Sequence, residues 1–264
     1  MPEIRVAGRR LRYEDTGGEG PAVLLLHGFP LSSAMWAPQL QALGDRFRLI
    51  APDQPGFGGS DSPADPDAWR IGDYGAAACA LLDSLGIASA VVAGHSMGGY
   101  VAFSLMRRNP DRVRALVLVD TRAGADSQET QATREEQQKE VRASGTAALR
   151  PRLLQKLLAP KNLGDPSLER SVLSLMDHPV AGYVAALEAM KQRPDSTPML
   201  SRIQVPTLVV VGAEDVLTPP SVARAMQAAI PGARLAEVPG AGHLANLEEP
   251  EGFNEALASF LAAL

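Results

Sequence analysis

Gly94-His95-Ser96-Met97-Gly98 is the stretch of sequence that decides the fold. It follows the apolar run Ala90–Gly94 and opens the helical pattern Met97–Arg108, so the serine lies in a sharp turn between a predicted strand and a predicted helix. Such a turn holds its central residue in a strained conformation and raises the side chain above the sheet edge. The flanking residues must be small because the two backbones nearly touch, and glycine satisfies that. The pattern predicts Ser96 as a nucleophile, and an ordinary glycine-rich turn is the alternative.

The rest of the chain alternates between strand and helix patterns on both sides of this turn. A continuous apolar strand is typical of a mostly parallel sheet covered on both faces. The predicted strands are Ile4–Val6, Leu11–Glu14, Ala22–His27, Phe47–Pro52, Ala90–Gly94, Arg114–Asp120, Thr207–Gly212 and Arg234–Val238. Between Thr121 and Met199 the pattern is helical only, with stretches at Gln128–Ala143, Thr146–Leu158, Pro166–Asp177 and Val180–Arg193. We therefore expect an α/β core of residues 1–120 and 201–264, with residues 121–200 inserted as a helical cap or lid.

Composition limits the class of protein. The chain has 264 residues, of which 45% are hydrophobic and 21% charged, as expected for one globular α/β domain with an insertion. The net charge of −5 argues against a nucleic-acid partner, and we interpret the run Arg107, Arg108, Arg112 and Arg114 as a solvated helix end. The single cysteine, Cys79, allows no internal disulfide. With no apolar leader and no membrane-length apolar stretch, the expectation is a cytoplasmic protein without a membrane partner.

A serine hydroxyl needs a neighbouring base to act as a nucleophile. Of the four histidines, His243 lies in the loop PGAGHLANLEEP between the last predicted strand and the last predicted helix, where glycines allow the backbone to reach inward. For His27 and His95 we favour structural roles, and His178 is interpreted as a helix-end residue. His243 is therefore the predicted base.

Two aspartates compete for the role of the acid that orients this base. Asp215 follows the strand Thr207–Gly212, and Asp120 ends the strand before the helical insertion. Both lie at carboxyl ends of strands, where open α/β sheets place their chemistry. We favour Asp215 because one helix and one strand separate it from His243, and because the chain order serine, aspartate, histidine is the expected one. Its neighbour Glu214 should point away.

Hydrolysis through a tetrahedral intermediate requires two donors for the oxyanion. The backbone N–H of Met97, directly after the nucleophile, is the first candidate. The second should come from the loop after Ala22–His27, where Phe29 is our choice. Pro30 cannot donate, which leaves Leu31 as the alternative.

With these residues in place, the chain resembles the α/β-hydrolase superfamily over nearly its whole length. The motifs are HGFP, DQPGFGGSD, GHSMGG, VVVGAED and PGAGH, and within the superfamily the chain is similar to the carboxylesterase and 3-oxoadipate enol-lactonase-like group. The resemblance implies an eight-stranded, mostly parallel sheet flanked by helices and a helical cap. Serine in the turn, where haloalkane dehalogenases and epoxide hydrolases use aspartate, argues against those two activities.

The sequence thus predicts a serine esterase that cleaves small to medium carboxylic esters through an acyl-enzyme. The alternatives are a lactone hydrolase of the 3-oxoadipate enol-lactonase type, a cofactor-free perhydrolase side activity, and a non-catalytic ligand-binding protein. Leu31 and Trp36 are expected to shape the acyl pocket beside Phe29 and Met97, and Arg122 is a candidate anchor for a carboxylated lactone. No metal site or cofactor is expected, the partner is a small-molecule ester, and the chain is a monomer or a homodimer.

Overall fold

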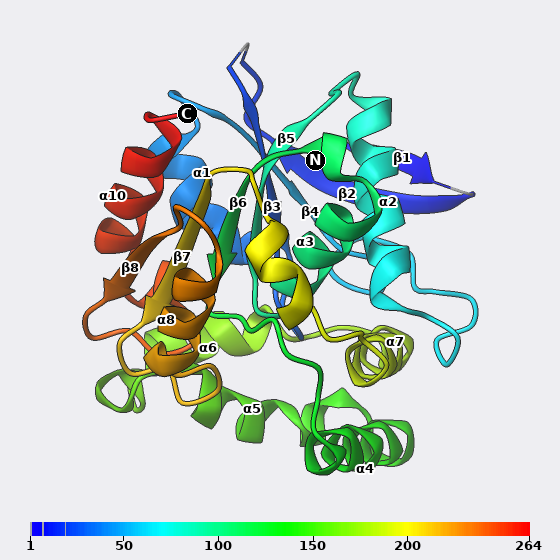
Figure 1. Ribbon diagram of the computed structural model, residues 1–264. Helices are drawn as coiled ribbons and strands as arrows, with labels where there is room; N and C mark the ends of the chain where they lie inside the picture. The colour runs from blue at the N-terminus through cyan, green and yellow to red at the C-terminus, as the bar shows by residue number, and fades with distance from the viewer. Residues whose placement is uncertain (1, 7, 19) are drawn as a thin grey trace.

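The computed structural model describes residues 2–6, 8–18 and 20–264, and it contains one mixed sheet of eight strands (Figure 1). The order across the sheet is β1-β2-β4-β3-β5-β6-β7-β8. β1 pairs with β2 and β2 with β4 in antiparallel fashion, and all the other pairs are parallel. The strands are β1 (Glu3–Val6), β2 (Arg9–Asp15), β3 (Ala22–Leu26), β4 (Arg48–Pro52), β5 (Ala90–His95), β6 (Val113–Val119), β7 (Thr207–Gly212) and β8 (Arg234–Val238). The expected eight-stranded, mostly parallel sheet is confirmed.

Alternate residues of the central strands enter two separate hydrophobic cores. In β3, Val23 and Leu25 belong to the core on one face of the sheet, whereas Leu24 and Leu26 belong to the core on the other. All five residues of this strand are buried. Because successive side chains point to opposite faces, a strand covered on both sides must be apolar throughout. This explains the uninterrupted apolar runs in the sequence.

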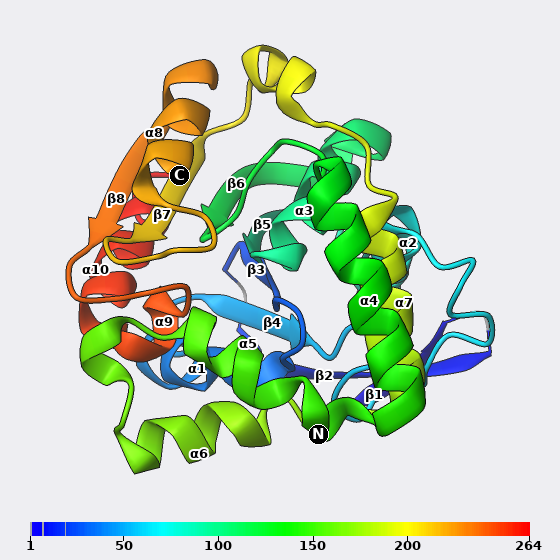
Figure 2. The ribbon, with the colours of Figure 1, turned by 90° about the horizontal axis from the view of Figure 1, so that it is seen from below.

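Helices cover both faces of the sheet, as Figures 1 and 2 show. α1 (Ala37–Leu43) and α10 (Pro250–Leu261) cover one face, and α2 (Ile71–Ser84), α3 (Met97–Arg108) and α8 (Pro220–Ala229) cover the other. The helical segment after β3 is divided: a 3₁₀ turn spans Ser33–Trp36 and α1 begins at Ala37. Pro38 explains the division, since a residue without an N–H fits the first turn of an α-helix and not its interior.

Four helices lie between β6 and β7 and form the inserted helical region. They are α4 (Gln128–Ser144), α5 (Arg150–Leu157), α6 (Pro166–Ser174) and α7 (Val180–Lys191), and they lie below the sheet in Figure 1. α4 and α7 pack side by side. α7 is buried over nine consecutive residues, whereas α4 is mostly polar and buries only Gln138 and Val141. Along the described chain, no helix is both long and apolar enough to cross a membrane.

Candidate active site

The predicted turn at Ser96 joins β5 directly to α3. Ser96 has φ 50° and ψ −111°, a left-handed conformation that a residue with a side chain rarely adopts. Glycine is required on both sides of it: a Cβ at Gly94 would overlap the carbonyl group of Gly98, and a Cβ at Gly98 would overlap that of Leu26. Strain of this kind is kept where the surrounding packing enforces it, and it aims the Ser96 hydroxyl away from the sheet.

The structure brings Ser96, His243 and Asp215 together from three separate loops. The Oγ atom of Ser96 lies 2.9 Å from Nε2 of His243, and Nδ1 of His243 lies 2.8 Å from Oδ2 of Asp215. The imidazole therefore has a hydrogen-bond partner on each nitrogen, which fixes its orientation. With Nδ1 donating to the carboxylate, Nε2 is free to accept the serine proton.

Asp215 is held as an anion. The backbone N–H groups of Leu217 and Thr218 donate to its Oδ1 at 2.7 and 3.0 Å, and the Thr218 hydroxyl donates to Oδ2. Burial by itself would raise the pKa of this carboxyl, but the attraction of His243 and these hydrogen bonds outweigh it and lower the pKa below its ordinary value. The adjacent Glu214 side chain is exposed, as expected.

Asp120, the rival acid, occupies a different position. It is fully buried with φ 44°, and its carboxyl group accepts hydrogen bonds from the N–H of Gly212 at 2.7 Å and of Ala245 at 3.4 Å. Burial, together with the nearby charge of Asp215, raises the pKa of Asp120 well above its ordinary value. Asp120 thus connects the ends of β6 and β7 to the short helix α9 (Ala245–Glu248), an element that the sequence did not predict.

The other three histidines hold loops in place. Nε2–H of His95 donates to the backbone carbonyl of His243 at 2.6 Å, and His27 accepts from the N–H of Gln54 at 2.9 Å. Burial lowers the pKa of His95 to about 3 and that of His27 to about 4, so both are neutral at ordinary pH. His178 lies between α6 and α7, where its Nδ1 accepts from the N–H of Gly58 at 3.2 Å. His95 therefore supports the loop that carries His243.

The two backbone N–H groups predicted to bind the oxyanion, those of Phe29 and Met97, have no protein acceptor among the described residues. The alternative donor, the N–H of Leu31, is already bonded to the carbonyl of Gly28 at 2.9 Å. Phe29 and Met97 flank the site from the loop after β3 and from the first position of α3.

A cavity of about 400 Å³ opens above Ser96 and His243. Its apolar wall comes partly from the inserted helices, with Leu153 and Leu157 of α5 and Met190 of α7, and its charged residues include Arg122. Of these residues, the sequence analysis had identified Arg122, but it had not identified Leu153, Leu157 or Met190. The spacing of Leu153 and Leu157 by four residues marked one face of a helix, but nothing in the sequence showed what that face would meet.

The expectation that Leu31 and Trp36 line the pocket needs correction. Both side chains have no exposed surface, and the described cavity lining includes neither of them. Trp36 packs instead against Phe253 of α10, with ring centroids 6.1 Å apart, in the core on the α1 and α10 face of the sheet. Met97, placed beside them in the prediction, is likewise buried, and the described cavity lining does not include it.

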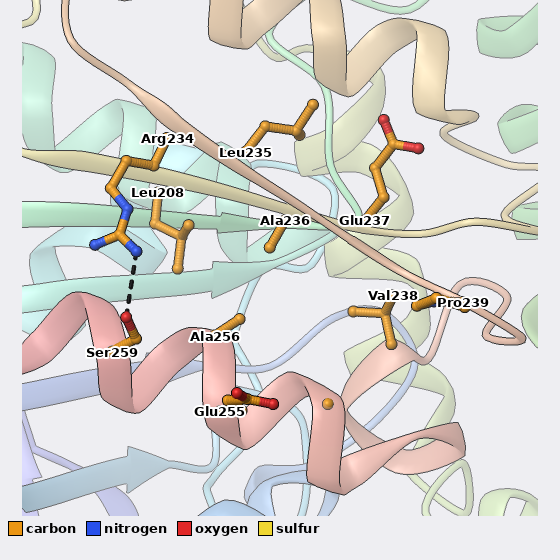
Figure 3. A pocket seen from close by; sticks show the side chains of 11 residues that line it. Leu208, Arg234, Leu235, Ala236, Glu237, Val238, Pro239, Glu255, Ala256 and Ser259 are labelled. Carbon is orange, nitrogen blue, oxygen red and sulfur yellow. Dashed lines mark hydrogen bonds between the residues drawn. The ribbon is translucent and has the colours of Figure 1, made fainter.

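We also considered whether another cavity or a cluster of metal-binding side chains in the described chain could form an active site. A cavity of about 380 Å³ lies between the edge strand β8 and α10, where Arg234 donates to Ser259 at 3.3 Å (Figure 3), but it contains no paired nucleophile and base. No group of three or more His, Cys, Asp or Glu side chains within residues 2–6, 8–18 and 20–264 could hold a metal ion.

Known proteins share this fold and length. The family described as the alpha/beta hydrolase fold matches residues 21–250, and the chain belongs to this family. A thermophilic esterase from Thermogutta terrifontis, solved with malate bound, is 34% identical with a TM-score of 0.95, covering 100% of this chain and 99% of its own. The enol-lactonase from Burkholderia xenovorans LB400 is 30% identical with a TM-score of 0.91, covering 99% and 100%. The sequence of 3-oxoadipate enol-lactonase 2 from Acinetobacter baylyi is 30% identical over 250 residues, 94% of this chain and 91% of that protein.

Proposed function

We propose that this α/β-hydrolase is a serine carboxylesterase acting on small to medium esters. The observation that carries the proposal is the continuous hydrogen-bond chain from Ser96 through His243 to Asp215, with the serine end opening into a cavity of about 400 Å³. A cavity of that volume is in the range for small-molecule sites. The similarity to an esterase at 34% identity supports the same class of substrate.

The proposed reaction uses the groups described above in the following order. Ser96 Oγ attacks the ester carbonyl carbon while His243 Nε2 takes the hydroxyl proton, and the negative oxygen is stabilised by the N–H groups of Phe29 and Met97. The imidazolium, stabilised by Asp215, then protonates the leaving alkoxide as the ester C–O bond breaks. Water attacks the acyl-enzyme with His243 again as the base, which releases the acid and restores Ser96.

We also propose that residues 121–200 act as a cap over this site. α5 and α7 contribute Leu153, Leu157 and Met190 to the cavity, so the inserted region shapes the space available to the acyl group. These three apolar side chains suit an alkyl chain, whereas α4 lines the cavity with polar side chains, among them Glu129 and Arg134.

Hydrolysis of a p-nitrophenyl ester series from acetate to decanoate tests the proposal. We expect turnover by the wild type that is abolished in Ser96→Ala, because no other hydroxyl has a hydrogen bond to His243 Nε2 in the described chain. The matched control is Ser84→Ala at the end of α2, where the hydroxyl bonds only to the carbonyl of Leu81, and this variant should keep full activity. Turnover retained in Ser96→Ala would refute the assignment.

A lactone hydrolase is the second candidate, and Arg122 is the observation that favours it. Arg122 lines the cavity and donates to the carbonyl of Leu217, and within the described residues it forms no ion pair with a carboxylate. A cation free in this way could bind the carboxylate of an anionic lactone. Assay of the same wild-type preparation on a carboxylated enol-lactone decides the point: a kcat/KM well above that for every neutral ester favours the lactone.

A further inference from the structure

The loop that carries His243 is hydrogen-bonded directly to the inserted helical region. The backbone N–H of His243 donates to the carbonyl of Leu157, the last residue of α5, at 2.9 Å. The side chain of Leu157 also lines the cavity at Ser96, so one residue both forms part of the cavity wall and bonds to the base. Figure 2 shows α5 beside α9, the short helix that follows His243.

Gly242, the residue before His243, allows the two backbones to meet. A Cβ added at Gly242 would lie 2.5 Å from the backbone nitrogen of Ala159 and 2.8 Å from the carbonyl carbon of Leu158. A residue without a Cβ is needed where one backbone approaches another this closely. The loop of the base therefore contacts the inserted region through main-chain atoms, which cannot turn aside as a flexible side chain can.

Glu248, the last residue of α9, bonds to the main chain on both sides of His243. Its Oε1 atom accepts from the N–H of Gly242 at 2.8 Å and from the N–H of Leu244 at 3.3 Å. Both residues are buried, and neither N–H has another acceptor among the described residues. The main chain at His243 is thus held at the residue before it, at the residue after it and at its own N–H.

The other oxygen of the same carboxylate bonds to the inserted region. Glu248 Oε2 accepts from the N–H of Ala159 at 2.6 Å and from Nδ2 of Asn162 at 2.7 Å. Both donors lie in the stretch just after α5, where a 3₁₀ turn spans Pro160–Asn162. Hydrogen bonds to a carboxylate are stronger than those between neutral groups. One side chain therefore connects residues 242–244 to residues 159–162.

The neighbouring Glu249 provides a comparison. It also joins the end of α9 to the inserted region, because its Oε1 accepts from Nζ of Lys161 at 2.6 Å. This pair lies on the surface, with side chains 39% and 50% exposed, and the Glu249 carboxylate accepts no hydrogen bond from residues 242–244 in the described chain. Of the two glutamates, Glu248 is the one bonded to the main chain around His243.

We propose that Glu248 is a positioning residue for His243, acting by fixing the loop of the base to residues 157–162. The proposal rests on the proposed function, since it requires His243 to be the base for Ser96. Asp215 orients the imidazole ring, whereas Glu248 holds the main chain from which the ring projects. Misplacement of a catalytic group by about 1 Å can cost about a hundredfold in rate. The same bonds keep Leu157, in the cavity wall, at a fixed place relative to the base.

Labelling of the full chain with a fluorophosphonate tests the proposal without the natural substrate. Ser96 Oγ attacks phosphorus, its proton passes to His243 Nε2 and fluoride leaves, so the rate depends on how these two groups are placed. Glu248→Gln has nearly the same shape, but its amide has one acceptor oxygen instead of two. We expect its labelling rate constant per reactive site to fall at least about tenfold, with labelling still reaching completion. Glu249→Gln is the matched control and should be labelled at the wild-type rate.

Steady-state kinetics on one p-nitrophenyl ester gives a second measure of placement. In Glu248→Gln, kcat per reactive site should fall by the same factor as the labelling rate, while KM stays within about threefold of the wild type. Thermal melting verifies that the variant folds. If it does not fold, Asn162→Ala replaces it: this change removes one donor on the side of the inserted region, and labelling should slow at least about threefold.

Hydrogen exchange measures the connection between the two segments. In Glu248→Gln, exchange should become faster both in residues 240–248 and in residues 157–163, whereas Glu249→Gln should match the wild type in both. Faster exchange in one segment alone would show that the carboxylate does not couple them, and it would overturn the proposal.

The labelling result separates this proposal from the proposed function. A lower melting temperature in Glu248→Gln with the wild-type labelling rate per reactive site would mean that Glu248 stabilises the fold without positioning the base, and it would overturn this proposal alone. Absence of labelling at Ser96 in the wild type would instead refute the serine nucleophile, and this proposal with it.

Discussion

Asp120 and Asp215 are two buried aspartates at neighbouring strand ends, and their hydrogen-bond partners separate their roles. Asp215 contacts Nδ1 of His243, whereas Asp120 accepts hydrogen bonds from backbone N–H groups of β7 and α9. The pKa of Asp215 is lowered, and that of Asp120 is raised well above its usual range by burial. One carboxyl is therefore suited to stabilise an imidazolium, and the other to connect loops.

Asp215→Asn should reduce kcat for a turned-over ester by about 10⁴-fold, because an amide in that position favours the wrong histidine tautomer. Asp120→Asn keeps an oxygen to accept from the N–H of Gly212, so its kcat should stay within about tenfold of the wild type. Steady-state kinetics on one p-nitrophenyl ester compares the two variants. An equal loss in both would mean that Asp120 also acts on His243.

At the scale of secondary structure, the sequence predicted most elements because each signal was local. The apolar strands and the turn at Ser96 depend on contiguous residues, and they appear at the expected places. The errors concern long-range packing: Trp36 was expected in the pocket, but it packs on Phe253, more than two hundred positions away in the chain. Likewise, the polar sequence of α4 gave no indication that Gln138 would be buried against α7, where it donates to the carbonyl of Val184 at 3.2 Å.

A buried ion pair joins the beginning of the inserted region to its end. Asp126, whose side chain is 1% exposed, precedes α4 and pairs with Arg193 after α7 and with Arg134 of α4. Arg193 also lies over the ring of Tyr100 in α3, 4.0 Å from its centroid. Burial by itself would raise the pKa of Asp126, but the two arginines have the larger effect, so the pKa is below its ordinary value. The pair therefore fixes both ends of the insertion against the core.

Asp126→Asn should destabilise this region by about 3–5 kcal/mol, because it leaves the charge of Arg193 buried without compensation. Hydrogen exchange of α4 and α7 measures the effect locally. Glu136→Gln, at the exposed Glu136–Lys139 pair of α4, is the control and should cost less than about 1 kcal/mol. If exchange in α4 and α7 were the same in both variants, the buried pair would have no role in holding the insertion.

For the whole molecule, buried titratable groups link stability to pH in opposite directions. Burial lowers the pKa of His27 to about 4 and of His95 to about 3, and it also lowers the pKa of His178. The unfolded chain protonates its histidines near pH 6.5, so as the pH falls below that value the unfolded state takes up protons that the folded state refuses. Asp120 acts in the other direction: its raised pKa means that the folded state holds a proton which the unfolded state has released.

Three histidines outweigh one carboxyl, so the free energy of unfolding should fall as the pH drops from 6.5 toward 4. Each unbalanced proton contributes a slope of up to about 1.4 kcal/mol per pH unit. His27→Asn removes one proton uptake by the unfolded state and should flatten the slope, whereas Asp120→Asn removes the opposing group and should steepen it. Urea unfolding at intervals between pH 7 and 4 measures all three slopes. A wild-type stability that is constant over this range, or variants that change the slope in the reverse order, would show that these buried groups do not control the acid sensitivity of the fold.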